Sequence, residues 1–191
     1  TMCLRLFADT FFAKRYGHRA VVLETIAAVP GMVAGVHLHF KSLRKMKTGY
    51  GFAIREMLAE AENERMHLMF FIDIAKPNLF ERFLVVIAQL IFMSFYFVLY
   101  MISFETAHRM VGYFEDEAVR SYTDYLDLIY KGEIENIYAP RLAVSYYNLK
   151  AGAKLSDMIM CVRDDEMKHA KVNHRYACLL YTSDAADDTD S

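Results

Sequence analysis

Residues 61–71 read AENERMHLMFF and carry a glutamate and a histidine three positions apart, Glu64 and His67. In a helix, this spacing places both side chains on one face, beside an apolar run. A second Glu-x-x-His motif occurs in the stretch DDEMKHA, from Glu166 to His169. Two such motifs on separate helices predict a buried metal site rather than a solvated helix face.

Composition places these motifs in a helical chain. The 191 residues are 55% hydrophobic and contain only 3 Pro and 8 Gly, which favours long helices. A formal net charge of −2 gives no reason to expect a nucleic-acid partner. The 3 cysteines lie far apart, so neither a disulfide framework nor a zinc site is expected. We predict a single all-α domain over residues 1–177, with helices over 2–14, 18–45, 50–75, 79 onward, 105–130 and 140–177.

Residues 178–191 do not fit this pattern. The stretch CLLYTSDAADD matches the in-frame translation of a transposase sequencing adapter. The alternative is a native acidic tail. We expect the segment to be non-native and exclude it from the fold, and we expect the chain to be truncated at its N-terminus.

Two further glutamates complete the metal-site pattern. Ferritin-like di-iron bundles take one Glu from each of two helices and a Glu-x-x-His from each of the other two. On the second expected helix, Glu24 shares its face with small residues that leave room for a metal. On the fifth, Glu115 lies on an apolar stripe, whereas Glu117 lies on a half-polar face. The other members of the stripe are His108, Val111, Ala118, Tyr122, Leu126 and Ile129. The predicted metal ligands are Glu24, Glu64, His67, Glu115, Glu166 and His169.

A third Glu-x-x-His motif ends at His108 and shows why one such motif alone is weak evidence for a metal site. His108 shares the stripe of Glu115 but lies two turns away, about 10 Å along a helix axis. That is too far for one dinuclear centre, so we interpret His108 as structural. Four buried carboxylates would otherwise repel one another, and two divalent iron ions offset their charge.

Residues 83–103 carry no charge and are long enough to cross a bilayer. Their Gln, Ser and Tyr residues make the segment less apolar than most membrane spans. The alternatives are a buried bundle helix and a helix that lies in one leaflet, and we favour these over a span.

Four segments resemble the sequence boxes of the alternative oxidase family, and the similarity extends over nearly all of residues 1–177. They are RAVVLETIAAVPGMVAG from residue 19, AENERMHLM from 61, GYFEDEAVRSYT from 112 and RDDEMKHAKVNH from 163. The family consists of cyanide-insensitive ubiquinol oxidases. The resemblance implies a ferritin-like four-helix bundle with two additional membrane-surface helices. It also implies two non-haem, carboxylate-bridged iron ions and the four-electron reduction of O2 to water without proton pumping.

The resemblance also implies roles for individual residues. The six predicted ligands match the metal-site positions of the family, where the histidines either bind iron or hydrogen-bond beside it. Tyr122 matches its redox-competent tyrosine. The positions that bind the quinol headgroup correspond to Arg19, Leu23, Glu117, Ala118 and Ser121. The supporting hydrogen-bond network corresponds to Asn63, Tyr146 and Asp165. The departures from the family pattern include Asp116, which replaces a Glu, and Tyr147, which replaces a Trp.

The implied partners are ubiquinol, O2, the lipids of one membrane leaflet and a second copy of the chain. The implied location is the matrix side of the mitochondrial inner membrane, with a bacterial cytoplasmic membrane as the alternative. Two other functions share the ligands: a di-iron hydroxylase or monooxygenase, and a ferritin-like iron-binding protein without oxidase activity. The oily helices and the quinol-type boxes favour the oxidase.

Overall fold

The computed structural model describes the backbone of residues 16–187 and the side chains of residues 17–178. Within residues 16–187 the chain forms helices α2 to α7 and no strand, apart from one isolated bridge between Tyr138 and Lys154. The predicted all-α class is therefore confirmed for this part of the chain. The helix expected over residues 2–14 lies outside the described residues.

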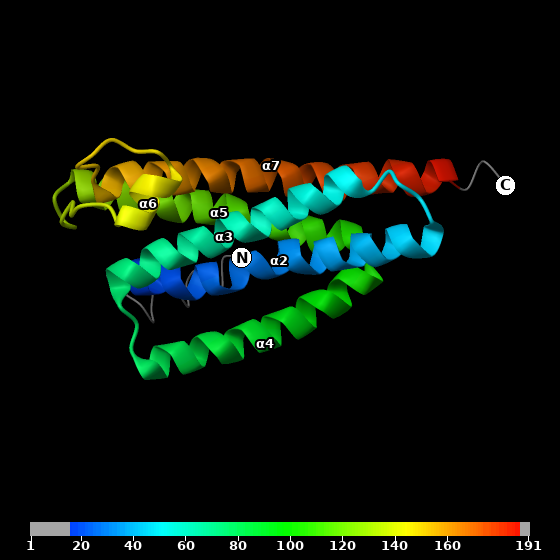
Figure 1. Cartoon of the computed structure of the whole chain (residues 1–191), viewed down its shortest axis with the longest axis horizontal. Helices are drawn as coiled ribbons and strands as arrows, with labels where there is room; N and C mark the ends of the chain where they lie inside the picture. The colour runs from blue at the N-terminus through cyan, green and yellow to red at the C-terminus, as the bar shows by residue number, and fades with distance from the viewer. Residues whose placement is uncertain (1–15, 188–191) are drawn as a thin grey trace. The chain divides into compact units, whose positions relative to one another are not determined.

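The chain divides into two compact units. Among the described residues, the first, here the α2–α4 unit, comprises Gly17–Phe104, and the second, the α5–α7 unit, contains residues 105–187. Each unit contains one of the two long helix pairs that a four-helix bundle requires, α2 with α3 and α5 with α7 (Figure 1). The expectation of a single domain over residues 1–177 stays a prediction.

Helices α2 (Tyr16–Lys45) and α3 (Gly51–Ala75) form an antiparallel pair in the α2–α4 unit (Figure 1). Pro30 lies inside α2 without ending it. Helix α3 stops at Lys76, whose φ of 47° lies in the left-handed region, and whose N–H donates to the carbonyl oxygen of Ile72. The following Pro77 cannot continue the helix, and α3 ends at residue 75, as predicted.

Helix α4 (Leu79–Ile102) begins with a complete capping box. The side chain of Asn78 accepts the backbone N–H of Glu81, and the Glu81 side chain accepts the backbone N–H of Asn78. Another oxygen of Glu81 lies 2.9 Å from Nδ1 of His18 on α2. The start of α4 is thus fixed both locally and against α2.

By length and composition, Gly17–Lys45 and Leu79–Ile102 could each cross a membrane. The two helices differ in environment, because 56% of the apolar window is buried in the first and only 11% in the second. In α4, the buried residues are Tyr96 and Tyr100. The alternative of a buried bundle helix is therefore wrong for α4, because most of its apolar surface is exposed. The remaining alternatives are a helix in the membrane surface and a membrane span.

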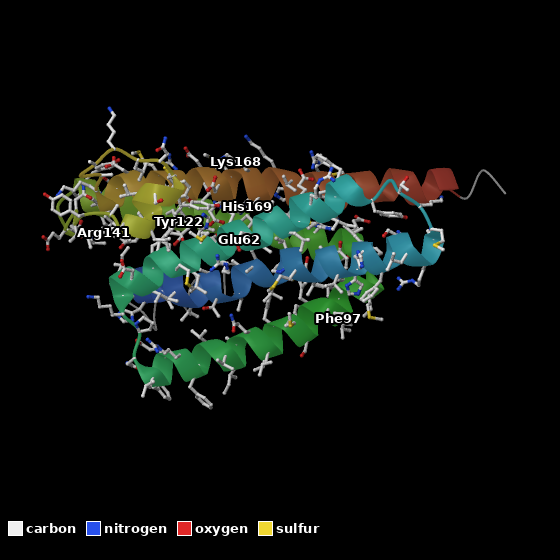
Figure 2. All side chains as sticks on the ribbon, viewed as in Figure 1. Glu62, Phe97, Tyr122, Arg141, Lys168 and His169 are labelled. Atoms are coloured by element: carbon white, nitrogen blue, oxygen red, sulfur yellow. The ribbon has the colours of Figure 1, made fainter. Side chains whose placement is uncertain are left out.

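Helix α4 runs parallel to α2 and contacts it along its length. The amide of Gln89 donates to the backbone oxygen of Thr25 at 3.3 Å, in the turn of α2 that carries Glu24. Towards the other end, the ring of Phe97 packs on His37 with centroids 4.6 Å apart (Figure 2). The apolar helix is therefore attached to the helix that carries a predicted metal ligand.

The α5–α7 unit consists of α5 (Phe104–Tyr130), the short α6 (Arg141–Tyr146) and α7 (Leu155–Asp187). The prediction of a single helix over residues 140–177 is wrong, because the chain leaves the helical conformation between α6 and α7. Two residues in the break, Asn148 and Gly152, have φ values of 52° and 85°. These left-handed conformations cannot occur inside a right-handed helix.

The buried face of α5 is the one that the apolar periodicity indicated. Five predicted stripe residues are buried together with Glu115: His108, Val111, Tyr122, Leu126 and Ile129. Ala118, the remaining member, is half-buried. Glu117 is half-buried as well and lies off this stripe. The choice of Glu115 over Glu117 as the inward-facing carboxylate is consistent with this pattern.

Candidate metal centre

Three predicted ligands meet inside the α2–α4 unit. Nδ1 of His67 lies 3.6 Å from Oε2 of Glu24 and 3.5 Å from Oε2 of Glu64. Each of these side chains offers a ligand atom within 4.8 Å of the other two, and all three are buried. We call these residues the α2–α3 triad.

A close helix crossing brings the α2–α3 triad together. Gly31 lies two turns after Glu24 on α2, and Met57 lies two turns before Glu64 on α3. A Cβ atom built on Gly31 would lie 2.5 Å from the carbonyl oxygen of Met57 and 3.0 Å from Cβ of Ala61. Only glycine lets the two backbones approach so closely at this point, one heptad from the triad.

The α2–α3 triad holds Glu24 in an unusual electrostatic state. Burial, followed by the negative charge of Glu64, raises the pKa of Glu24 from 4.5 to about 7. His67 lowers the pKa of Glu24 through a hydrogen bond and through its charge when protonated, but these effects do not cancel the rise. A divalent cation could replace the proton that this carboxylate otherwise holds near neutral pH.

The other three predicted ligands meet inside the α5–α7 unit. Glu115 of α5 and Glu166 and His169 of α7 each offer a ligand atom within 4.8 Å of the other two. Their exposed fractions are 5%, 1% and 8%, so all three are buried. The i, i+3 spacing of Glu166 and His169 places both on the α7 face that packs against α5. We call these residues the α5–α7 triad.

The two triads offer the same donors: two carboxylates and one imidazole. Carboxylate oxygen and imidazole nitrogen suit iron and manganese, whereas soft thiolate ligands are absent from both triads. With a neutral imidazole, each triad carries two formal negative charges, which one divalent ion offsets. The residues of each triad therefore fit a transition-metal ion by donor type, proximity and charge.

The predicted tyrosine and quinol positions lie on the helices that carry the triads. Tyr122 is buried on α5, two turns after Glu115 (Figure 2). On α2, Arg19 is buried, and the neighbouring turn exposes 39% of Leu23. On α5, the half-buried positions are Glu117, Ala118 and Ser121.

The predicted hydrogen-bond network extends to Tyr147, which stands where the family pattern has a Trp. Asp165, next to Glu166, accepts a hydrogen bond from the hydroxyl of Tyr147 at 2.9 Å and another from Lys168 at 2.7 Å. Tyr147 also packs edge-on against the predicted Tyr146, with ring centroids 5.0 Å apart. The third predicted member, Asn63, is half-buried beside Glu64.

Two other polar residues lie beside the triads and were not predicted. Glu60 is 5% exposed and lies one turn before Glu64 on α3. Asn173 is 1% exposed and lies one turn after His169 on α7. Each lies four positions from a predicted ligand on the same helix, which is the signal that could have identified them.

Fold and triads together define a class: an all-helical protein whose buried carboxylate and imidazole groups could hold metal ions. The sequence profile of the alternative oxidase family matches residues 1–178. This chain belongs to the alternative oxidase family.

Named relatives agree with this assignment. A "Ubiquinol oxidase, mitochondrial" from Batrachochytrium dendrobatidis is 53% identical over 174 residues, which are 91% of this chain and 55% of the relative. "Ubiquinol oxidase 1c, mitochondrial" from Arabidopsis thaliana is 53% identical over 93% of this chain and 54% of its own length. "Ubiquinol oxidase 2, mitochondrial" from Nicotiana tabacum is 52% identical over 90% and 57%. The chain thus spans little more than half the length of these relatives.

Proposed function

We propose that this protein is a membrane-bound di-iron quinol oxidase that couples the oxidation of ubiquinol to the reduction of O2 to water without pumping protons. The observation that carries the proposal is the pair of buried Glu–Glu–His triads in a chain of the alternative oxidase family. The names of its relatives support ubiquinol as the electron donor.

The two triads are the proposed ligands of two iron ions. Glu24, Glu64 and His67 supply one donor set, and the α5–α7 triad supplies the other. When bound, the iron pair supplies the two-electron exchange with O2 that protein side chains do not provide. The protein's part is to bring the carboxylates and imidazoles together and to keep bulk water out, for which the burial of both triads is suited. The bound cations would in turn keep the carboxylates deprotonated.

Quinol oxidation must deliver protons as well as electrons. Two quinols give four electrons and four protons, which with one O2 yield two quinones and two waters. We propose that Arg19 donates a hydrogen bond to a quinol oxygen and that Glu117 accepts one, with Leu23, Ala118 and Ser121 contacting the ring. The phenol of Tyr122, buried on the Glu115 stripe, is the proposed electron donor among the side chains.

A water-insoluble quinol requires access from the bilayer. The exposed apolar surface of α4 supports a monotopic attachment to one leaflet, in which α4 lies in the membrane surface without crossing it. The names of the relatives support a mitochondrial location. We propose the matrix side of the inner membrane as the place within it and a homodimer as the assembly, as the resemblance to the family implies.

Oxygen consumption tests the proposed activity. Purified full-length, iron-loaded protein should consume O2 with a short-chain quinol, resist cyanide and be blocked by a hydroxamic acid. Oxygen atoms appearing in an organic product would indicate a hydroxylase instead, and iron uptake without turnover would indicate a ferritin-like protein. If the iron-loaded protein consumes no oxygen with quinol, the oxidase proposal is wrong.

Magnetic measurements test whether the triads serve one dinuclear centre. Mössbauer and electron paramagnetic resonance spectra of the oxidised protein should show two iron ions per chain that are antiferromagnetically coupled. Two uncoupled high-spin ferric signals would mean that each triad holds a separate ion, and the dinuclear proposal would fall.

A further inference from the structure

A buried hydrogen bond joins α5 to α7 away from the α5–α7 triad. Nδ1 of His108 lies 2.9 Å from Oδ1 of Asn173, and both residues are 1% exposed. A buried polar contact of this kind fixes the rotation and separation of two helices, because breaking it leaves polar atoms in an apolar core. His108 is therefore structural, as the sequence indicated, and has a specific partner.

The direction of this hydrogen bond follows from the second contact of Asn173. Its Nδ2 group donates to the backbone oxygen of His169 at 3.0 Å, so its Oδ1 atom faces His108 and must accept. His108 then carries its proton on Nδ1. Burial lowers the pKa of His108 more than the hydrogen bond to Asn173 raises it, which keeps the ring neutral near pH 7. The ring also stacks on Tyr176, with centroids 5.2 Å apart.

The contact is in register with the triad. Asn173 lies two turns after Glu166 and one turn after His169, whereas His108 lies two turns before Glu115. Because α5 and α7 run antiparallel, the same offset on both helices places the His108–Asn173 pair one heptad from Glu115 and Glu166 (Figure 1). Asn173 is also bonded directly to the peptide group of one of the proposed ligands, His169.

We propose that the His108–Asn173 hydrogen bond is a positioning contact that holds α5 and α7 at the separation at which Glu115, Glu166 and His169 converge before a metal binds. The proposal rests on the metal-binding role proposed for this triad. Neither His108 nor Asn173 touches the metal in this scheme. They act through the helix backbones and through the carbonyl of His169.

A second polar link between the same helices provides a matched control. Nε2 of His174 lies 2.9 Å from Oδ2 of Asp116, but both side chains are well exposed, at 38% and 45%. The ring of His174 packs over Gly112, where a Cβ atom would lie 2.7 Å from it. An exposed link contributes little to helix separation, so its loss should change metal affinity by no more than about twofold.

Anaerobic titration of the apo-protein with Fe²⁺ against a competing chelator tests the proposal without any turnover. An asparagine at position 108 places its amide nitrogen where histidine has Nδ1, and a glutamine places it where histidine has Nε2. His108→Asn should therefore keep the hydrogen bond to Asn173 and bind Fe²⁺ within a few-fold of the wild type. His108→Gln should lose about 10- to 100-fold in affinity, the range for residues that support metal ligands. His174→Gln is the control.

Both His108 variants remain polar, and circular dichroism with thermal unfolding checks that they fold alike. Asn173→Leu should match His108→Gln, and the double variant should be no worse than either, because the two residues share one contact. Equal Fe²⁺ affinities for His108→Asn and His108→Gln would overturn the proposal, as would a folded Asn173→Leu that binds like the wild type.

Hydrogen exchange of the apo-protein gives a second readout that involves no metal. The amides around Glu115 should exchange faster in His108→Gln than in His108→Asn, and equal protection would count against a positioning role. A wild type that binds iron but fails to reduce O2 would refute the proposed oxidase and leave the positioning contact intact. An active wild type with unaffected variants would refute the contact alone.

Discussion

Glu24 and His67 face each other across the α2–α3 crossing, with 3.6 Å between Oε2 of the carboxylate and Nδ1 of the ring. The two side chains are only 4% and 0% exposed, and Glu64 lies 3.5 Å from the same ring nitrogen. A carboxylate in this position either takes up a proton or binds a cation. Several measurable properties of the protein depend on which of these occurs.

Stability of the apo-protein should fall as the pH rises from about 4.5 to about 7. The pKa of Glu24 is 4.5 in its ordinary state and about 7 in the folded chain, so folding favours the protonated form. The stability gained from this proton uptake is fully present below pH 4.5 and is lost as the pH passes 7. Its size is about 1.4 kcal/mol for each unit by which folding raises the pKa. Chemical unfolding at a series of pH values measures it.

Glu24→Gln should flatten this part of the pH profile, because the amide does not titrate. Glu133→Gln, which changes an exposed carboxylate in the loop after α5, should leave the profile as it is. A Glu24→Gln variant with the full wild-type slope would show that another group causes the pH dependence.

Glu115→Ala and Glu117→Ala should separate metal binding from quinol oxidation. Glu115 belongs to the α5–α7 triad, so its loss should remove iron from that triad and abolish oxygen consumption. Glu117 is half-buried off the stripe and bonded to Arg120 at 3.3 Å, so its loss should leave the iron content unchanged and slow quinol turnover. Iron analysis and oxygen uptake measure both. Full iron and full turnover in Glu115→Ala would refute the ligand assignment.

Gly31→Ala should loosen the α2–α3 triad. The added methyl group would meet the carbonyl oxygen of Met57 at 2.5 Å, so the helices must move apart. We expect a loss of about 1–3 kcal/mol in stability, typical of overpacking, together with weaker Fe²⁺ binding. Gly49→Ala, where nothing lies within 4 Å of the new Cβ, is the control and should bind iron normally. Unchanged iron affinity in Gly31→Ala would mean that the triad does not depend on this crossing.

Tyr147→Phe should destabilise the protein by about 1 kcal/mol, because it removes the hydrogen bond to Asp165 and keeps the ring. Tyr113→Phe is a suitable comparison, since Tyr113 is 55% exposed and its ring contact with His174 does not need the hydroxyl. Denaturant unfolding of the two variants gives the difference. If the two lose the same stability, the bond between Tyr147 and Asp165 contributes nothing specific.

A charge on α4 should weaken membrane binding. Leu90 and Ile91 are 62% and 66% exposed, and burying a carboxylate among acyl chains is costly. Co-sedimentation with phospholipid vesicles should decrease for Leu90→Glu and Ile91→Glu but not for Leu142→Glu on α6, where a leucine is 45% exposed. Equal vesicle binding by all three variants would argue against a membrane role for α4.

The long helices were predictable because their signals are local. The periodicity of apolar residues predicted α2, α3 and α5 to within two residues of their observed ends. Pro77 and Asn78 mark the boundary between α3 and α4. The break between α6 and α7 was missed because the residues around Asn148 and Gly152 are otherwise compatible with a helix. Their left-handed conformations depend on how the loop packs, which a helix periodicity does not report.

The triad residues were predictable for the same reason, since each lies on the inward stripe of its own helix. The partners of those residues were not. His108 and Asn173 lie 65 residues apart, and their hydrogen bond depends on the register between α5 and α7. Tyr147 bonds to Asp165 only because the chain turns back after α6. Predicting a contact between two helices requires their relative placement, and the spacing of residues within one helix does not contain that information.

Each triad is assembled from consecutive long elements of the chain. Glu24, Glu64 and His67 come from two adjacent helices joined by a short turn, and the other three donors come from α5 and α7 with only α6 between them. The two helix pairs follow one another along the chain, and folding during synthesis starts from the N-terminal part. A growing polypeptide would therefore complete its first set of donors before α5 has left the ribosome. Metal uptake and protein synthesis can then proceed in the same order along the chain.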